Sequence, residues 1–456
     1  DYSEILNDYA DIIAIGTVAD VVDLKDENRA IVKYGVSKIN TNPCNGVNAL
    51  RQIAGVSEKP LNAVGVTYSL APRINAAGRI ESAETALKLL LCEDLKMALD
   101  IAEQVDICNR KRHDFENEIM EAAVKHIESN EMLKHSKVIV VCGEGWHHGV
   151  IGIVSSKITE KYYKPSTVIS INTDGSAKAS GRSIAGFNIF DGLSECADTL
   201  TKFGGHDLAA GFSLDKTNID LFRKKINEYA KNIMTEEILT PKLVIDAVIS
   251  PEDISCSTAA SIDIMEPFGI GNKAPVFCIE DTTVSGVRLH KTGKHAFLTL
   301  EKNKCKFDAP AFNVPESTCT LSPGEKVSAA GMININTFRG IDNVQFVVKD
   351  IKSADKTYID ENSLRALFVC IKNYVNKNTF RFKLSDIKEH LLAAGVNLGI
   401  TKIKTALKIF MELELVKSVF DGDVVTINRD KNFYSKCNLE DSSVYIEEIK
   451  NLNDGK

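Results

Sequence analysis

Residues 142–158, CGEGWHHGVIGIVSSKI, and residues 200–212, LTKFGGHDLAAGF, decide the fold of the central part of this chain. The apolar run 138–141 before the first stretch predicts a buried strand, and a loop with two adjacent histidines follows it. Apolar residues spaced as on one helix face then predict a helix over 150–162. A strand, a helix and a polar loop between them are typical of α/β domains that bind phosphate.

The same pattern continues through the rest of this region. After a strand at 167–171 comes a short polar run, and a helix over 189–200 is expected to end at a glycine pair before a strand at 209–212. Backbone N–H groups, a guanidinium and an imidazole are the groups that hold a phosphate oxyanion. Groups of these kinds in this region are the Arg182 guanidinium, the imidazoles of His147, His148 and His206, and the backbone at Gly204-Gly205.

Each candidate has an ordinary structural alternative. Gly204 and Gly205 fit a helix C-cap and turn, His147 and His148 fit an exposed loop, and Arg182 fits a solvated edge strand. The combination of these groups within one α/β region favours a phosphate site.

These residues resemble the DHH-associated domain of the DHH phosphoesterase superfamily, with its Trp-His-x-Gly-Val turn, Ser-Arg-Ser strand and Gly-Gly-His motif. The chain resembles the RecJ family more closely, over nearly its whole length. RecJ enzymes are bacterial exonucleases that degrade single-stranded DNA from its 5′ end. Ala179 stands where the family often has glycine and His148 where it often has glutamine, and neither departure changes a charged group.

Composition limits the classes of function. A chain of 456 residues predicts three or four domains. With a net charge of −7, nucleic-acid binding must come from local basic patches rather than from the overall field. No apolar run approaches the roughly 18 residues of a membrane span, and no signal peptide is recognisable. The eleven scattered cysteines, without a C-x-x-C pair, indicate reduced thiols in a cytoplasmic protein.

Residues 1–50 have helical spacing, with a second helix expected from Asn28. Asp20 is a carboxylate in an apolar stretch, which fits either a helix end facing solvent or a buried group that needs a metal or a partner. Residues 16–20, Gly-Thr-Val-Ala-Asp, match the last metal-binding motif of the superfamily. The resemblance implies that Asp20 binds Mn²⁺ or Mg²⁺, and that it acts with His206 in catalysis.

The other metal motifs of the superfamily, D-x-D and Asp-His-His, lie upstream in the family and are not found before Asp20 here. The chain begins at Asp1 rather than at methionine, so we expect a fragment. A two-metal site needs several ligands. We therefore expect this polypeptide to be inactive by itself, whereas the complete enzyme would hydrolyse phosphodiesters through two metal ions.

Residues 51–135 are predicted to be largely helical, with a long helix over 95–127 that links two lobes. Before it lies Leu70–Arg79, LAPRINAAGR, in which Pro72 and Gly78 are expected to bound a loop.

Arg73, Asn75 and Arg79 in this stretch offer donors to phosphate or sugar, and solvated arginines between helices are the ordinary alternative. The stretch resembles the P-R-x-N-A-A-G-R motif of RecJ. This resemblance assigns Arg73, Asn75, Arg79 and His147 to substrate binding. It also implies that a set of residues lines the cleft opposite the metals and binds phosphate: Arg79, Ser180, Arg182, Ser183, Gly204, Gly205 and His206.

Residues 238–352 predict a small closed β-barrel of the OB type, because short alternating runs are separated by Gly and Pro. The expected strands are Leu243–Ile245, Val276–Ile279, Ala296–Leu300, Lys326–Ala329 and Gln345–Val348.

The segment 286–295 is expected to be a basic loop, and three phenylalanines (Phe297, Phe312 and Phe338) lie on or beside strands. OB barrels bind single strands by stacking bases on aromatic rings beside a basic groove, although most such rings belong to the core. The nucleic-acid-binding candidates are Arg288, Lys291, Lys294, Phe338 and Arg339.

Residues 353–456 predict a winged-helix module. Such domains bind either DNA or proteins, so only an auxiliary role is assigned to it. Helices are expected at 364–375, 384–394 and 401–413, the third with a threonine N-cap, followed by a hairpin at 416–427 that turns at Asp421-Gly422. The third helix carries Lys402, Lys404 and Lys408.

The predicted fold is therefore multidomain α/β plus β-barrel. Its parts are a remnant of the DHH domain (1–50), a helical linker (51–135), a DHH-associated domain (136–237), an OB barrel (238–352) and a winged-helix-like module (353–456).

The predicted function is 5′→3′ hydrolysis of single-stranded DNA in repair and recombination, by a monomer that works with a single-strand-binding protein or a helicase. The alternatives are a DHH phosphodiesterase acting on short oligonucleotides and a non-catalytic single-strand-binding protein.

Overall fold

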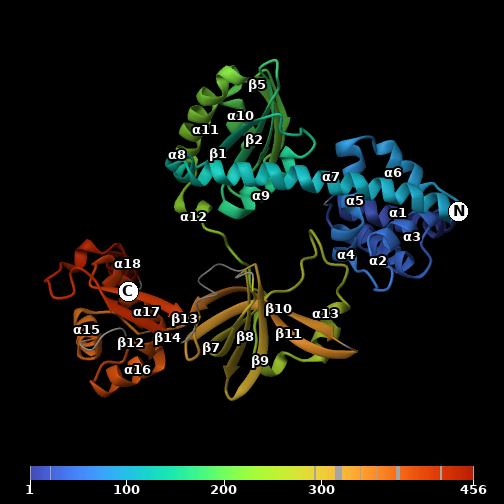
Figure 1. Cartoon of the computed structure of the whole chain (residues 1–456). Coiled ribbons are helices and arrows are strands. Elements are labelled where there is room, and N and C mark those ends of the chain that lie inside the picture. The colour runs from blue at the N-terminus through green and yellow to red at the C-terminus, as the bar shows by residue number, and fades with distance from the viewer. Residues whose placement is uncertain are drawn as a thin grey trace. The chain divides into compact units, whose positions relative to one another are not determined.

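Two units make up the computed structural model: Asp1–Lys242 with Pro267–Lys273, and Leu243–Glu266 with Ala274–Lys456. The structure describes residues 2–20, 22–291, 294–313, 321–338, 340–355, 357–375, 380–421 and 424–454. Figure 1 shows the elements of both units, coloured in chain order.

The first unit begins with an all-helical region, as its spacing of apolar residues predicts. Helices α1 and α2 touch closely because Gly35 leaves no side chain between them, and an added Cβ there would overlap Ala10 and Ala14. The helices are α1 (Tyr2–Ala19), α2 (Asp26–Thr41), α3 (Asn45–Ile53), α4 (Ala63–Ser69), α5 (Ala71–Ile80), α6 (Ala83–Leu90), α7 (Leu95–Glu128) and α8 (Glu131–His135).

The long helix α7 begins at an Asp94 N-cap, whose side chain accepts from Met97 N at 2.7 Å, and confirms the linker helix predicted over 95–127. Its first half packs in the core of the helical region through Ala98, Ala102 and Val105. Its second half packs against the sheet that follows (Figure 1). A single rigid element therefore belongs to both cores of this unit.

The sheet of the first unit has the order β1-β2-β3-β5-β4, with β1 and β2 parallel and the remaining pairs antiparallel. Helices α9 and α7 pack on one face, and α10 and α11 pack on the other. The elements are β1 (Ile139–Glu144), α9 (Ile151–Tyr162), β2 (Ser166–Ile171), β3 (Ser176–Arg182), α10 (Ile189–Ser194), β4 (Lys202–Gly205), β5 (Ala209–Asp215), α11 (Ile219–Ile233) and α12 (Glu236–Leu239), with 3₁₀ turns at Ala197–Thr199 and Lys216–Asn218.

The second unit contains a closed barrel, because β10 pairs with β7 as well as with β11. This closure confirms the predicted OB-type barrel. Its elements are β6 (Ala247–Val248), a 3₁₀ turn (Pro251–Asp253), α13 (Cys256–Asp263), β7 (Phe277–Leu289), β8 (His295–Lys302), β9 (Cys305–Phe312), β10 (Lys326–Phe338) and β11 (Ile341–Ser353).

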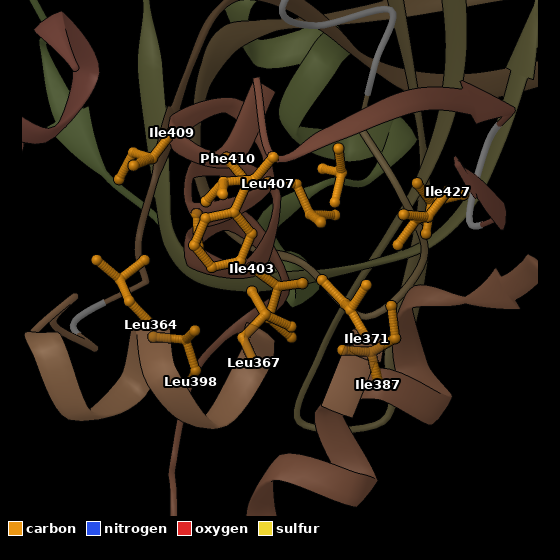
Figure 2. Close-up of a cluster of buried hydrophobic side chains, with 14 of the residues drawn as sticks. Leu364, Leu367, Ile371, Ile387, Leu398, Ile403, Leu407, Ile409, Phe410 and Ile427 are labelled. Atoms are coloured by element: carbon orange, nitrogen blue, oxygen red, sulfur yellow. The ribbon is translucent and has the colours of Figure 1, made fainter. Parts of the chain in front are cut away.

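The C-terminal module has the helix, strand, helix, helix, hairpin order of a winged helix, with a three-stranded sheet β12-β14-β13. Figure 2 shows its core, where side chains of α15, α16, α17 and β14 point toward one another. The elements are α15 (Glu361–Val375), β12 (Phe380–Lys383), α16 (Leu384–Ala393), α17 (Ile400–Glu412), β13 (Val416–Asp421), β14 (Val424–Arg429), a 3₁₀ turn (Leu439–Asp441) and α18 (Ser443–Asp454).

Several predicted local structures were wrong. Residues 70–79 are not a loop: Ala71–Ile80 form helix α5, since Pro72 stands in its first turn, where a missing N–H costs nothing. The helix predicted over 189–200 ends at Ser194. The glycine pair is not a helix end but the last part of strand β4, paired with β5.

In the second unit, Leu243–Ile245 do not form a strand; their side chains are exposed and the strand β6 begins at Ala247. Segment 286–289 belongs to strand β7 rather than to the predicted loop. Helix α17 is capped by Gly399 and not by Thr401, whose hydroxyl donates to Glu325 instead. The predicted turn residue Gly422 lies outside the described residues.

Within the described ranges, no helix is both long and apolar enough to cross a membrane. The cysteines of these ranges are all free thiols.

Candidate functional site: an arginine cluster in the first unit and an aromatic face on the barrel

Arg182 and Ser180 lie on one face of strand β3, because side chains two residues apart in a strand point the same way. The Arg182 guanidinium donates to Ser180 Oγ at 3.1 Å. This face meets the first turn of α9 at Gly152, where an added Cβ would lie 3.0 Å from Ser180 Oγ and 3.2 Å from Arg182 Nη2. The absence of a side chain at Gly152 therefore lets the start of α9 approach Ser180 and Arg182.

The N-terminus of α9 has no side-chain cap, and its N-cap residue is Val150. The first N–H groups of a helix carry partial positive charge and favour an anion. Arg182 adds a full positive charge at this helix end. Burial lowers the pKa of the Arg182 guanidinium, and the positive charge of Arg79 lowers it further. Two arginines beside a helix N-terminus form a site that suits a phosphate group.

Arg79, at the C-terminal end of α5, reaches this cluster from the helical region. Its guanidinium donates to Gly149 O at 3.2 Å, just before α9. Arg79 and Asn75 also line a hollow of about 180 Å³, together with Val18, Ala19 and Arg112. Arg79 of the PRINAAGR stretch and Arg182 of the Ser-Arg-Ser strand therefore both lie beside the start of α9.

Arg73 is placed differently from Asn75 and Arg79. Its guanidinium forms an ion pair with Asp106 of α7 at 2.8 Å and donates to Ser69 O at 2.6 Å. Arg73 thus holds α5 against the long helix in this structure, whereas the side chains of Asn75 and Arg79 are exposed.

The loop before α9 is held in place by aromatic stacking. The His147 ring stacks on Phe115 of α7, with centroids 5.0 Å apart and planes 17° from parallel. His147 Nδ1 accepts from the N–H of Gly149 at 3.1 Å, so in the neutral ring the proton is on Nε2. His148 faces Asn172 at 3.1 Å and takes no part in this stack.

The Gly-Gly-His turn lies at the same sheet edge as Arg182. Ser183 N donates to Leu208 O at 2.9 Å, which places the β4–β5 connection beside the end of β3. His206 is exposed and contacts Asp207 at 3.0 Å. Gly205 has φ +151°, and an added Cβ would overlap Ala209 and Ala210, so glycine is required there.

Asp20 is exposed at the C-terminal end of α1 and lines a hollow of about 260 Å³ with Asn75 of α5. This agrees with the alternative of a helix-end carboxylate facing solvent. Across the described residues, no group of three or more His, Cys, Asp or Glu side chains is arranged to hold a metal ion.

The barrel carries an aromatic and basic face on strands β7, β8 and β9. The Arg288 guanidinium stacks over the Phe297 ring at 4.4 Å, and Phe297 meets Phe312 edge-on at 6.2 Å. His295 lies 5.7 Å from Phe312 and 5.5 Å from His290, measured between ring centroids. Phe312 is 49% exposed. We call these five residues the barrel aromatic face.

Of this face, sequence reasoning selected Arg288 as a binding residue but not Phe312, His290 or His295. The sequence does carry a sign of this face. Residues alternate in burial along 295–302, and this alternation turns His295 and Phe297 away from the barrel core. Lys291 and Lys294 are exposed. Arg339 and the side chain of Phe338 lie outside what the structure describes.

Two models of known domains match this chain. The DHHA1 domain model matches residues 135–232 and the RecJ OB domain model matches residues 245–350. The single-stranded-DNA-specific exonuclease RecJ of Bacillus subtilis (strain 168) is 36% identical over 349 residues, covering 76% of this chain and 44% of the relative. The RecJ of Escherichia coli (strain K12) is 31% identical over 357 residues, covering 76% and 61%.

A solved structure agrees with these matches. The crystal structure of RecJ in complex with Mn²⁺ from Thermus thermophilus covers 79% of this chain and 53% of its own, with a TM-score of 0.66 and 28% identity. The chain belongs to the RecJ family. It spans about half the length of the curated relatives it matches.

Gly149, which lies just before α9 and against the C-terminal end of α5, provides a first test of this site. In Gly149→Ala the added Cβ would overlap the carbonyl oxygen of Arg79, a backbone atom that cannot move alone. We expect a loss of stability of about 1–3 kcal/mol, as for other overpacking substitutions. The measurement is urea denaturation followed by fluorescence of Trp146, the only tryptophan and a near neighbour. The control is Gly204→Ala, because its added Cβ meets open space and should change the urea midpoint of unfolding little. Gly145→Ala does not serve as a control, because the positive φ of Gly145 would itself strain an alanine.

Proposed function

We propose that this protein is a single-stranded-DNA-specific 5′→3′ exonuclease and that its residues 1–456 supply the strand-gripping part. The observation that carries the proposal is the convergence of Arg79, Ser180 and Arg182 on the N-terminus of α9, which has no side-chain cap. This arrangement suits a terminal 5′-phosphate, which offers three oxygens and a double negative charge to guanidinium groups beside the positive end of the helix dipole.

The barrel aromatic face supports the proposal for the rest of the strand. Exposed rings beside an arginine stack on bases without regard to sequence, which suits an exonuclease that must pass every base. A dinucleotide substrate needs no such surface, so the barrel favours long strands over the short oligonucleotides of other DHH phosphodiesterases.

Asp20 is proposed as one ligand of a divalent ion, since it matches the metal motif of the family and borders the same region as Asn75. The RecJ structures from Thermus thermophilus are complexes with Mn²⁺ and with Mg²⁺. Two-metal hydrolysis needs ligands beyond Asp20. We therefore propose that the 456-residue chain binds a strand but does not cleave it.

The further proposals follow from the family alone. They are a role in repair and recombination, a cytoplasmic location, a monomeric state, and association with a single-strand-binding protein or a helicase.

The deciding experiment measures binding and Mn²⁺-dependent degradation in parallel, with the 456-residue chain and 5′-phosphorylated single-stranded DNA. We expect binding that exceeds binding to duplex and to a 5′-hydroxyl strand, without cleavage. Equal affinity for dinucleotides and long strands would favour the short-oligonucleotide phosphodiesterase. Failure to bind any single strand would refute the proposal, and degradation by this chain would refute the statement that it does not cleave.

The barrel aromatic face is tested separately by Phe312→Ala. Because base stacking on one ring contributes about 1–3 kcal/mol, we expect the affinity for single-stranded DNA to fall about 5- to 150-fold. The drop should be equal for 5′-phosphorylated and 5′-hydroxyl strands, measured by fluorescence anisotropy. Phe420→Ala, in the wing of the C-terminal module, is a control aromatic outside the barrel. An unchanged affinity of Phe312→Ala would remove this face from the binding surface.

A further inference from the structure

A buried charge pair lies on the long helix α7 beside the arginine cluster. Arg112 Nη1 donates to Glu116 Oε2 at 2.7 Å, and Arg112 Nη2 donates to Asn109 Oδ1 at 2.9 Å. Arg112 is 8% exposed and Glu116 is 2% exposed. Buried charges of this kind are costly, and breaking one such pair leaves an uncompensated charge.

Glu116 also joins α7 to α9. Its second carboxylate oxygen forms an ion pair with Lys157 of α9. One turn of α7 therefore holds α9 in two places: through Glu116 to Lys157, and through Phe115 to His147 in the loop before α9. The position of the α9 N-terminus, which faces Ser180 and Arg182 across Gly152, depends on these contacts.

The charges in this region do not cancel. Desolvation lowers the pKa of Arg112, and Arg79 lowers it further although Glu116 opposes the shift. Arg79 acts on the pKa of Arg182 in the same direction. Burial and then Arg112 lower the pKa of His113. Glu116 is the carboxylate shared by Arg112 and Lys157, whereas the charge of Arg79 acts on both Arg112 and Arg182. The excess positive charge is available to a bound anion.

One donor of Arg112 is left over. Its Nε is buried and has no hydrogen-bond partner, although the residue lines the hollow that also contains Asn75 and Arg79. Glu116 and Asn109 therefore hold Arg112 at the wall of this hollow, but they leave its Nε–H without an acceptor.

We propose that Glu116, through Arg112 and Lys157, is a positioning residue that sets the spacing of Arg79 and Arg182 for a 5′-terminal phosphate. This inference rests on the proposed function, because it names how the chain distinguishes a 5′-phosphate from a 5′-hydroxyl end. Glu116 does not touch the phosphate, since a carboxylate would repel it. It compensates the buried Arg112 and fixes α7 against α9, so that the guanidinium groups of Arg79 and Arg182 face the same point.

The experiment compares the dissociation constants of the 456-residue chain for two thymidylate strands, of about 12 nucleotides to suit a barrel of this type. The strands carry a 3′ fluorophore and end in a 5′-phosphate or a 5′-hydroxyl. The ratio of the two constants measures recognition of the phosphate, whereas the 5′-hydroxyl constant alone measures the rest of the strand-binding surface.

In Glu116→Gln we expect the ratio to fall about 3- to 30-fold, the range for substitutions that act on a ligand through a contact network. The 5′-hydroxyl constant should stay within about twofold, which a general loss of structure would not allow. Glu116→Asp keeps the charge and should retain part of the ratio. The matched control is Glu128→Gln, because Glu128 is another carboxylate of α7 that contacts α9, accepting from Tyr162 Oη at 2.7 Å, and it lies away from the arginines.

A ratio unchanged in folded Glu116→Gln would overturn the proposal, as would an equal fall in Glu128→Gln. If circular dichroism shows that Glu116→Gln does not fold, the same ratio is measured for Lys157→Met. This variant leaves the Arg112–Glu116 pair intact but removes the ion pair to α9, so we expect the ratio to fall, and an unchanged ratio overturns the inference. A ratio near one in the unsubstituted chain would instead refute 5′-phosphate recognition itself, and so the proposed function.

Discussion

Arg182→Ala is expected to lower the affinity for a 5′-phosphorylated single strand about 10- to 100-fold. A hydrogen bond to a charged group contributes about 1.5–3 kcal/mol, and the guanidinium offers two such bonds in a fixed fork. The guanidinium is held in position before any ligand binds, since it donates to Ser180 Oγ and to Gly181 O and lies beside Gly152. The measurement is fluorescence anisotropy with strands that carry a 5′-phosphate or a 5′-hydroxyl.

The matched control for this result is Lys178→Ala. Lys178 lies on the same face of β3 as Ser180 and Arg182 and is exposed, but four residues before the arginine, or about 13 Å along the strand. It should change both affinities by the same small factor. Arg182→Lys keeps the charge without the fork and should give an intermediate loss. An equal loss for the two strands in Arg182→Ala would show that Arg182 binds the backbone in general and not the 5′ end.

Glu325→Ala is expected to lower the free energy of unfolding of the second unit by about 3–5 kcal/mol, the cost of removing one partner of a buried ion pair. Glu325 is 3% exposed and accepts from Ser322 N at 2.6 Å, from Thr401 Oγ1 at 2.8 Å and from Lys404. Burial lowers the pKa of Lys404, whereas the charge of Glu325 opposes this shift. Without Glu325, a buried ammonium group would lose this ion pair between barrel and winged helix.

Two probes separate the units in this experiment. Trp146 is the only tryptophan and lies in the first unit, whereas far-ultraviolet circular dichroism reports on both. Glu325→Ala should therefore shift the dichroism transition in urea and leave the fluorescence transition in place. Glu361→Ala, which removes an exposed pair with Arg365 at 3.7 Å, is the control and should cost little. A shift of the fluorescence transition alone would contradict the expected result.

Helix α17, the third helix of the winged helix, uses two of its lysines for contacts within the second unit. Lys402 pairs with Glu448 of α18 and Lys404 pairs with Glu325. Two of the three lysines that mark this helix as a candidate for DNA binding therefore make contacts within the second unit. The auxiliary role of this module stays a prediction.

The errors of prediction have local physical causes. Pro72 and Gly78 are typical of loops, but proline is tolerated in the first turn of a helix, and Gly78 lies against Ala83 in a close contact with the next helix. The pair Gly204-Gly205 suits a C-cap, yet it continues a strand because β5 offers a paired edge. In both cases the deciding contact is with the next element along the chain, Gly204 with Gly211 of β5 and Gly78 with Ala83 of α6, and residue preferences alone do not show it.

Glu116 and Arg112 were not selected from the sequence, although both stand in the long helix that was predicted. Their spacing of four residues is common on exposed helix faces, where such pairs contribute little. Phe312 was recognised as a ring near a strand but not as an exposed one. In both cases the decisive quantity is burial, and burial depends on what packs against the residue.

By itself, the sequence determined the architecture of this protein: the α/β domain, the linker helix, the barrel and the winged helix, and the motifs that place it in the RecJ family. Periodicity and turn residues are local properties, and they were sufficient for these results. Only the tertiary structure decided that Arg73 is paired with Asp106, whereas Arg79 and Arg182 meet at the start of α9. The physical reason is that the surroundings of a charge, and thus its availability to a ligand, are set by residues far away in the chain.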